Sequence, residues 1–157
     1  MPTATAAVLL ALAVVSTGLY AGFMLIFRTG IMPALARLTD EQFVTVMRRV
    51  NEYVPRAVFL AVFAGVVVFP AAALALPVDG RSAAQRWLVL AGLVCAVLNH
   101  LVTIAGNIPL NNALAASGSG DPGAARAAFE TRWNTLHLAR TVLVTAAFAS
   151  LVAATLT

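Results

Sequence analysis

Residues 57–76 read AVFLAVFAGVVVFPAAALAL, an apolar stretch without a charged side chain. An α-helix rises about 1.5 Å per residue, so this stretch is long enough to cross a hydrocarbon core of about 30 Å. Together with its flanking residues it predicts a transmembrane span at about 55–77.

The composition of the whole chain agrees with a membrane protein. Of the 157 residues, 61% are hydrophobic and only 10% are charged, against about 45–50% and about 25% in ordinary soluble domains. A water-soluble globule is therefore excluded. All ten basic residues are arginines and the formal net charge is +4. We interpret this excess as a signal of membrane topology rather than of nucleic-acid binding.

Three further apolar segments have the length of a membrane span. The four predicted spans cover residues 4–27, 55–77, 87–110 and 134–156. The first lacks the basic residues that open a signal peptide, so we keep it as a mature helix. The sequence thus predicts an all-α fold, an integral membrane four-helix bundle that forms one transmembrane domain over residues 1–157.

The connection between the first two spans, residues 28–54, has the pattern of an amphipathic helix. Apolar residues recur at helical spacing from Phe43 to Val54 among charged residues. Thr39 or Asp40 is the expected N-cap. We expect this interfacial helix to lie on the membrane surface.

The arginines are unevenly distributed between the two sides of the predicted bundle. Loops one and three and the adjoining helix ends carry seven of them, and the middle loop carries two. Arginine-rich short loops stay in the cytoplasm. We therefore expect a multi-pass protein of the cell membrane with loops one and three in the cytoplasm and both termini outside. The seven are Arg28, Arg37, Arg48, Arg49, Arg56, Arg126 and Arg132; the two are Arg81 and Arg86.

Polar side chains at membrane depth are costly, so their positions are informative. On the third span, His100, Asn107 and Asn111 share one helical face. The fourth span opens with a second polar stripe. Because the third span ends where the fourth begins, both stripes lie at one end of the bundle, where Arg28 also closes the first span. This arrangement predicts a cavity that opens to the cytoplasmic leaflet. The second stripe comprises Trp133, His137, Arg140 and Thr141.

These polar residues also have structural interpretations, which the sequence leaves open. Asparagines between membrane helices often only hydrogen-bond to a neighbouring helix. Arg140 either binds an anion or has a structural role, because a charge at this depth must pair, reach the surface or line water. His137 is either a general base or an interfacial histidine. His100 and His137 together suggest a metal or haem site, but the spans contain no acidic residue to support it.

Two motifs carry a family resemblance. The segment NIPLNNAL at residues 107–114, followed by Trp133-Asn134-x2-His137-x2-Arg140, resembles the anthrone oxygenase-like family of small four-helix membrane proteins. Many members are known only as a domain of unknown function. The resemblance extends over nearly the whole chain, from a glycine-rich first span to the W-N-x5-R motif that opens the fourth. The residues that match family motifs are Asn107, Asn111, Asn134 and Arg140.

The resemblance implies oxidation of an anthrone to an anthraquinone. An anthrone is an acidic, apolar molecule whose carbanion reacts with O2 without a metal, so the enzyme needs a base, an oxyanion partner and an apolar slot. Under this hypothesis His137 removes the proton, Arg140 stabilises the enolate, and no cofactor or metal is expected. The expected substrate-binding residues are Arg28, Asn107, Asn111, Trp133 and Asn134.

Two other functions stay open. One is a non-enzymatic accessory or binding protein, and the other is a haem or copper redox protein that uses His100 and His137. An enzyme or binder needs a cavity of about 300 Å3 or more at the polar end, whereas a packing role needs the polar groups to satisfy one another. The expected partners are the lipid bilayer and a small hydrophobic substrate, with no nucleic acid. Gly18 and Gly22 suit a close helix crossing and make a homo-oligomer conceivable.

Overall fold

The computed structural model describes residues 4–157, and every regular element in this range is helical. Four continuous helical stretches are long and apolar enough to cross a membrane, which confirms the predicted four-helix, all-α fold. Two of them contain a π-helical turn, labelled η. The elements are α1 (Ala4–Ile26), η1 (Phe27–Ile31), α2 (Met32–Leu35), α3 (Asp40–Tyr53), α4 (Ala57–Ala75), α5 (Ala83–Val102), η2 (Thr103–Asn107), α6 (Ile108–Ala116) and α7 (Pro122–Ala154).

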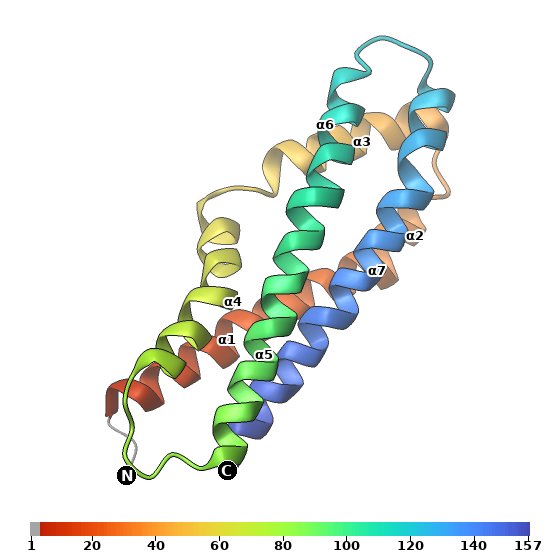
Figure 1. The fold of residues 1–157 in the computed structure, drawn as a ribbon. Helices are drawn as coiled ribbons and strands as arrows, with labels where there is room; N and C mark the ends of the chain where they lie inside the picture. Colours follow the sequence, from red (N-terminus) through yellow and green to blue (C-terminus); the bar gives the residue numbers. More distant parts are fainter. Residues whose placement is uncertain (1–3) are drawn as a thin grey trace.

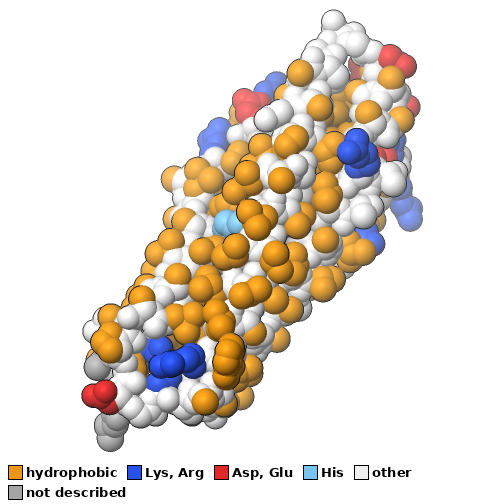
Figure 2. Space-filling model, viewed as in Figure 1, with side chains coloured by type: hydrophobic (Ala, Val, Ile, Leu, Met, Phe, Trp, Pro, Cys, Tyr) orange, Lys and Arg blue, Asp and Glu red, His pale blue; other side chains and the backbone are white. Residues whose placement is uncertain are grey.

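The long helices pack in a ring: α1 contacts α4 and α7, and α5 contacts α4 and α7. Figure 1 shows the resulting elongated bundle, with both chain ends at one end and α3 crossing the other. On the face drawn in Figure 2, hydrophobic side chains cover the middle of the molecule and charged side chains gather toward its two ends. This distribution is the one a bilayer requires.

The helices extend beyond the predicted apolar spans. The first continues through η1 and α2 to Leu35, the third continues to Ala116, and the fourth begins at Pro122. Asp121 caps the fourth, because its side chain accepts a hydrogen bond from the Gly123 N–H at 2.9 Å. Apolarity marks only the part of a helix that is long enough to cross lipid, whereas helical hydrogen bonding continues into the polar segments on either side.

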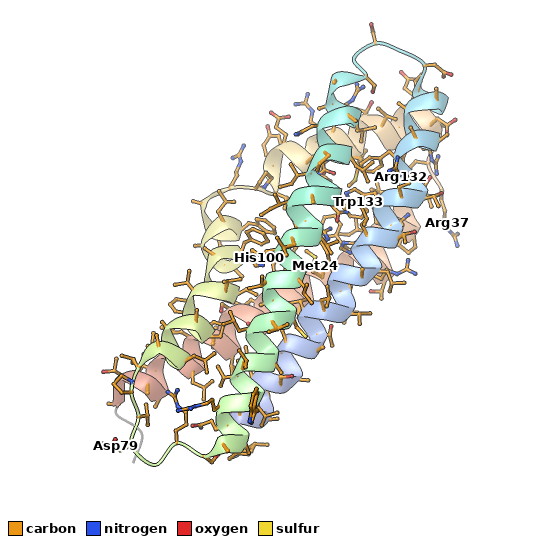
Figure 3. All side chains as sticks on the ribbon, viewed as in Figure 1. Met24, Arg37, Asp79, His100, Arg132 and Trp133 are labelled. Carbon is orange, nitrogen blue, oxygen red and sulfur yellow. The ribbon has the colours of Figure 1, made fainter. Side chains whose placement is uncertain are left out.

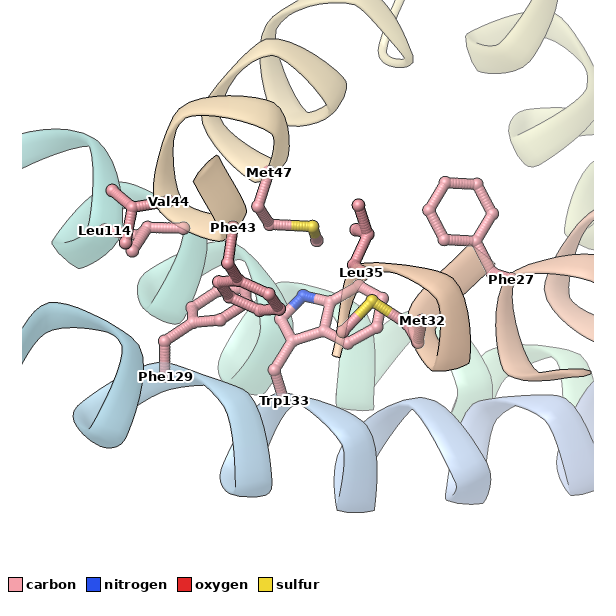
Figure 4. Close-up of a cluster of buried hydrophobic side chains, with 9 residues drawn as sticks. All are labelled: Phe27, Met32, Leu35, Phe43, Val44, Met47, Leu114, Phe129 and Trp133. Atoms are coloured by element: carbon pink, nitrogen blue, oxygen red, sulfur yellow. The ribbon is translucent and has the colours of Figure 1, made fainter. Parts of the chain in front are cut away.

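The amphipathic helix predicted between the first two spans is α3, and Thr39 is its N-cap. The Thr39 side chain accepts a hydrogen bond from the Gln42 N–H, and the Gln42 side chain accepts one from the Thr39 N–H. This capping box satisfies two free backbone donors. The buried face of α3 packs on α6 and α7 and closes this end of the bundle, as the cluster in Figure 4 shows.

Both π-helical turns have the same sequence cause. Each contains a glycine and is followed by a proline, in the stretches 30–33 and 106–109. Proline lacks an N–H and its ring collides with the carbonyl four residues earlier, so the preceding turn widens. In the second turn, the first and last residues, Thr103 and Asn107, are both buried in the bundle.

Two glycines mark close helix approaches. A Cβ on Gly106 would lie 2.8 Å from Cδ1 of Leu136, and a Cβ on Gly18 would lie 2.8 Å from Cε2 of Phe148. Gly18 therefore serves a crossing of α1 with α7 inside the chain. Gly22 differs, because a Cβ there would meet no atom of the described residues within 4 Å. The homo-oligomer remains a prediction.

Candidate functional site

A cavity of about 630 Å3 lies where α1, α3, α4, η2, α6 and α7 meet. This volume is within the range of small-molecule sites, about 300–1,000 Å3. Figure 3 labels two of its wall residues, Met24 on α1 and Trp133 on α7. Most of the wall is aromatic or aliphatic, including Phe23, Phe27, Met47, Phe59, Phe63 and Ile108.

Five of the seven predicted site residues line this cavity: Asn107, Asn111, Trp133, His137 and Arg140. The other two predicted residues are not among those that line the cavity. Arg28 is exposed, and Asn134 is half-buried with its side-chain oxygen unpaired within the described chain.

Arg140 is a buried cation, with only 6% of its surface exposed. Its Nη2 donates to Nδ1 of His137 at 2.8 Å, and its Nη1 donates to Oγ1 of Thr103 at 3.4 Å. The ion pairs found within residues 4–157 join Arg49 to Glu52 and Arg126 to two carboxylates, so none of them involves Arg140. A buried charge without a counter-ion is costly. The cavity wall is therefore suited to an anion that pairs with Arg140.

His137 is fully buried, and its hydrogen bonds fix its tautomer. A guanidinium only donates hydrogen bonds, so Nδ1 of His137 must be the acceptor of the bond from Arg140. The other nitrogen, Nε2, then carries the hydrogen and donates to the carbonyl oxygen of Met24 at 3.0 Å. His137 is consequently a neutral imidazole whose single lone pair is directed at Arg140.

Trp133 forms a rigid wall of the cavity. Its Nε1 donates to the side-chain oxygen of Asn111 at 2.9 Å, and its carbonyl oxygen accepts from Nδ2 of Asn107 at 3.3 Å. The indole stacks on the ring of His137, with centroids 4.7 Å apart and planes at 14°, and on Phe129 at 5.9 Å. Both asparagines thus hold α6 and η2 against α7, and the ring contacts with His137 and Phe129 fix the indole in the cavity wall.

His100 has a different environment. Its ring stacks on Phe63 at 3.8 Å, Nδ1 lies 2.9 Å from the Ala96 carbonyl oxygen, and Nε2 lies 2.8 Å from the Phe63 carbonyl oxygen. Among residues 4–157, no three His, Cys, Asp or Glu side chains group closely enough to hold a metal ion. With the nitrogens of His100 and His137 already bonded, these residues do not fit a shared metal or haem.

Several lining groups were not predicted from the sequence. Thr103 carries no charge and stands at the start of η2, and Met24 contributes a backbone carbonyl, which leaves no trace in residue type. Phe59 and Phe63, one turn apart on α4, carried a readable signal as a paired aromatic face. The glycine-x-x-proline pattern at the end of each π-helical turn was a readable signal for these turns.

The comparison with protein families bears on the same region. A family model described as Anthrone oxygenase matches residues 43–150, more than half of the chain. The matched range contains α3 to α7 up to residue 150, including all five predicted residues that line the cavity. No curated protein and no solved structure matches the chain significantly.

Proposed function

The chain belongs to the anthrone oxygenase family, and we propose on this basis that it is a membrane oxygenase of small, acidic aromatic substrates. One observation carries the proposal: the Arg140 guanidinium, buried and without a carboxylate partner in the described chain, lines an aromatic cavity of about 630 Å3. An anthrone ionises to an enolate, and the enolate oxygen is an anion of the kind that a fixed guanidinium stabilises.

Proton removal starts from the bond between Arg140 and His137. The substrate oxygen takes the hydrogen bond that Arg140 now donates to Nδ1 of His137. The freed Nδ1 is then a base within reach of the acidic C–H. The resulting imidazolium and guanidinium both face the enolate, which offsets their repulsion. Rings of the substrate pack against Trp133, where the wall is flat and fixed.

Oxygen then reacts with the carbanion directly. The carbanion carbon transfers electrons to O2 and forms a C–O bond, giving a peroxide. The peroxide takes up a proton, and loss of the second C–H proton with cleavage of the O–O bond releases water. The balance is CH2 plus O2 giving C=O plus H2O, and the substrate carbon supplies all the electrons. The protein supplies the base, the oxyanion partner and the apolar slot.

The membrane location suits such a substrate. Four apolar helices make this a membrane protein. In this proposal the anthrone partitions into the lipid and enters the cavity from there. The arginine-rich end of the bundle, which holds the cavity, is placed at the cytoplasmic side by the bias of basic residues. The partners in this proposal are the bilayer and the substrate, and no nucleic acid takes part.

Oxygen uptake by purified protein in lipid nanodiscs with emodin anthrone tests the proposal. We expect uptake to fall at least about 10²-fold in Arg140→Ala and in His137→Ala, the usual scale for an oxyanion partner or base. Arg132→Ala, which removes an exposed arginine of the same helix, is the matched control and retains uptake. Folded Arg140→Ala protein with wild-type uptake would contradict the proposal.

A second candidate function is a binding protein for the same class of anion. The observation that favours it is the His137 lone pair, which is already used by Arg140. A binder needs the cation but no base. It would retain the anion tightly, show no oxygen uptake, and bind equally well after His137→Ala as long as Arg140 keeps its place.

A further inference from the structure

A layer of buried polar side chains consists of Arg140, which lines the cavity, and three residues that do not. Its members come from three helices, α1, α5 and α7, and all are at least nine-tenths buried. Their exposed fractions are 0% for Thr17, 1% for Tyr20, 0% for Asn99 and 6% for Arg140.

The packing brings Tyr20, Asn99 and Arg140 to within about one helical turn of one another along the bundle. Tyr20 belongs to a buried cluster with Ala96 of α5 and Val144 of α7. Asn99 follows Ala96 by about one turn, and Arg140 precedes Val144 by one turn, so each lies on the same face of its helix.

Thr103 joins two members of the layer directly. Its Oγ1 donates to the carbonyl oxygen of Asn99 at 2.9 Å and accepts from Nη1 of Arg140 at 3.4 Å. Tyr20, Asn99 and Arg140 therefore form one group. Thr17 lies one turn from Tyr20 along α1, on the side away from Met24 and its bond to His137.

Polar atoms of this layer lack hydrogen-bond partners among the protein groups described. They are Oγ1 of Thr17, the Tyr20 hydroxyl, both amide atoms of Asn99 and Nε of Arg140. The atoms are not bonded to one another either. Buried polar groups in folded proteins are nearly always paired, and leaving this many bare would rival the net stability of a domain.

Two hydroxyls close to this layer are paired. Ser16 donates to the Leu12 carbonyl oxygen, and Thr141 donates to the His137 carbonyl oxygen. Each is thereby satisfied within its own helix. Thr17 lies next to Ser16 on the same helix, but its hydroxyl makes no such bond within the described chain.

We propose that the part of this layer formed by Tyr20, Asn99 and Nε of Arg140 is an internal site for one or two water molecules, through which Tyr20 and Asn99 position the guanidinium. A buried water makes two to four hydrogen bonds, which the donors and acceptors of this layer can supply. Water bound at Nε holds the guanidinium plane with both Nη groups toward the cavity. The positioning role rests on the proposed anion site, whereas the water site does not.

The water site is tested by a crystal structure in lipidic mesophase at a resolution that shows ordered water. We expect water density within hydrogen-bond distance of at least two members among the Tyr20 hydroxyl, the Asn99 amide and Nε of Arg140. A dry layer in which the Asn99 amide bonds directly to Tyr20 or Arg140 would overturn the proposal.

Tyr20→Phe gives a second test, since it removes only the hydroxyl. A dry layer in which the hydroxyl stays unpaired predicts that this variant unfolds at a higher temperature, because an unpaired buried hydroxyl disappears; a dry layer with a direct bond between Tyr20 and Asn99 is recognised in the crystal structure. A hydrated layer predicts no such gain, because a water loses one of its partners. Tyr53→Phe, at the exposed tyrosine of the chain, is the matched control.

The positioning role is tested with two ligands of nearly the same shape. The probes are 2-hydroxy-1,4-naphthoquinone, an anion at neutral pH, and its neutral 2-methyl ether. We expect Tyr20→Phe to weaken binding of the anion about 3- to 10-fold, the scale of one hydrogen bond, and to leave the ether unchanged. Tyr53→Phe should change neither. Equal loss of both probes would mean a purely structural role and overturn the positioning claim.

The two proposals fail in different ways. If wild-type protein does not prefer the anion, the proposed anion site is wrong, and with it the positioning role. The crystal structure would still decide separately whether water is bound behind Arg140. If the anion binds and the layer is dry, only the inference about the internal water site is wrong.

Discussion

Nη2 of Arg140 lies 2.8 Å from Nδ1 of His137, one helical turn earlier on α7. This bond fixes three properties of the cavity at once. It makes His137 neutral, directs the histidine Nε2–H to the Met24 carbonyl oxygen of α1, and leaves the guanidinium charge without an anionic partner in the described chain. A substrate anion that competes for Arg140 therefore also releases a base, so binding and proton removal are coupled through one hydrogen bond.

The bond between Trp133 and Asn111 predicts a measurable stability effect. Asn111→Leu leaves the buried indole N–H without its acceptor and should lower the free energy of unfolding by about 1–3 kcal/mol. Trp133→Phe removes the N–H itself, so the two changes together should cost less than their sum. Chemical denaturation of the two single variants and the double variant checks this. Strict additivity would show that the bond contributes nothing.

Arg126 should be the arginine whose loss most weakens the contact between α7 and α3. Its guanidinium donates to Asp40, to Glu130 and to the carbonyl oxygens of Ala36 and Leu38. We expect Arg126→Ala to lower the free energy of unfolding by about 1–3 kcal/mol.

The exposed pair of Arg49 and Glu52 provides the control for Arg126. Both side chains are well exposed, and such pairs contribute about 0–1 kcal/mol. Arg49→Ala should therefore leave thermal stability nearly unchanged. Equal effects of Arg49→Ala and Arg126→Ala would contradict the claim that Arg126 holds α7 against α3.

Gly106 should tolerate a branched side chain poorly. A Cβ at this position meets Cδ1 of Leu136 at 2.8 Å, so Gly106→Val must displace the Leu136 side chain or separate η2 from α7. Such overpacking costs about 1–3 kcal/mol, and the displaced η2 should also weaken ligand binding through Thr103. Gly22→Ala, where the added Cβ meets no described atom within 4 Å, should behave as wild type. Thermal unfolding of both variants in nanodiscs separates the two cases.

The predicted membrane orientation can be measured with single cysteines. In a Cys95→Ala background, Ser119→Cys in the third loop should react with an impermeant maleimide only after the membrane is opened. Asp79→Cys in the middle loop should react in intact cells. The reverse pattern would place the cavity end outside and contradict the orientation inferred from the arginines.

The sequence predicted those parts of the fold and site that depend on side-chain type and helical period. Apolar runs located the four membrane helices, and spacings of three and four residues brought Asn107, Asn111, His137 and Arg140 to one cavity. Thr39 was one of the two N-caps expected from the sequence, and α3 begins after it. These features follow from residue type and spacing, which can be read from a single sequence.

Other features required the three-dimensional structure because they arise from backbone geometry or from contacts between distant helices. The π-helical turns shift the helical register, and the bond from Arg140 to Thr103 joins two different helices. The Met24 carbonyl and the unpaired atoms of Tyr20 and Asn99 depend on which helices are neighbours. Arg28 was expected at the site from its depth alone, yet the structure leaves it exposed.

The central claim is that Arg140 makes the cavity a site for anions, and equilibrium binding tests this claim most directly. The affinities of 2-hydroxy-1,4-naphthoquinone and its neutral methyl ether are measured for wild-type protein and for Arg140→Met. We predict that the wild type prefers the anion by at least about 10-fold, the scale of a charge-assisted hydrogen bond, and that Arg140→Met abolishes this preference. Equal binding of both probes to the wild type, or a preference that survives in Arg140→Met, would contradict the claim that Arg140 makes this cavity an anion site.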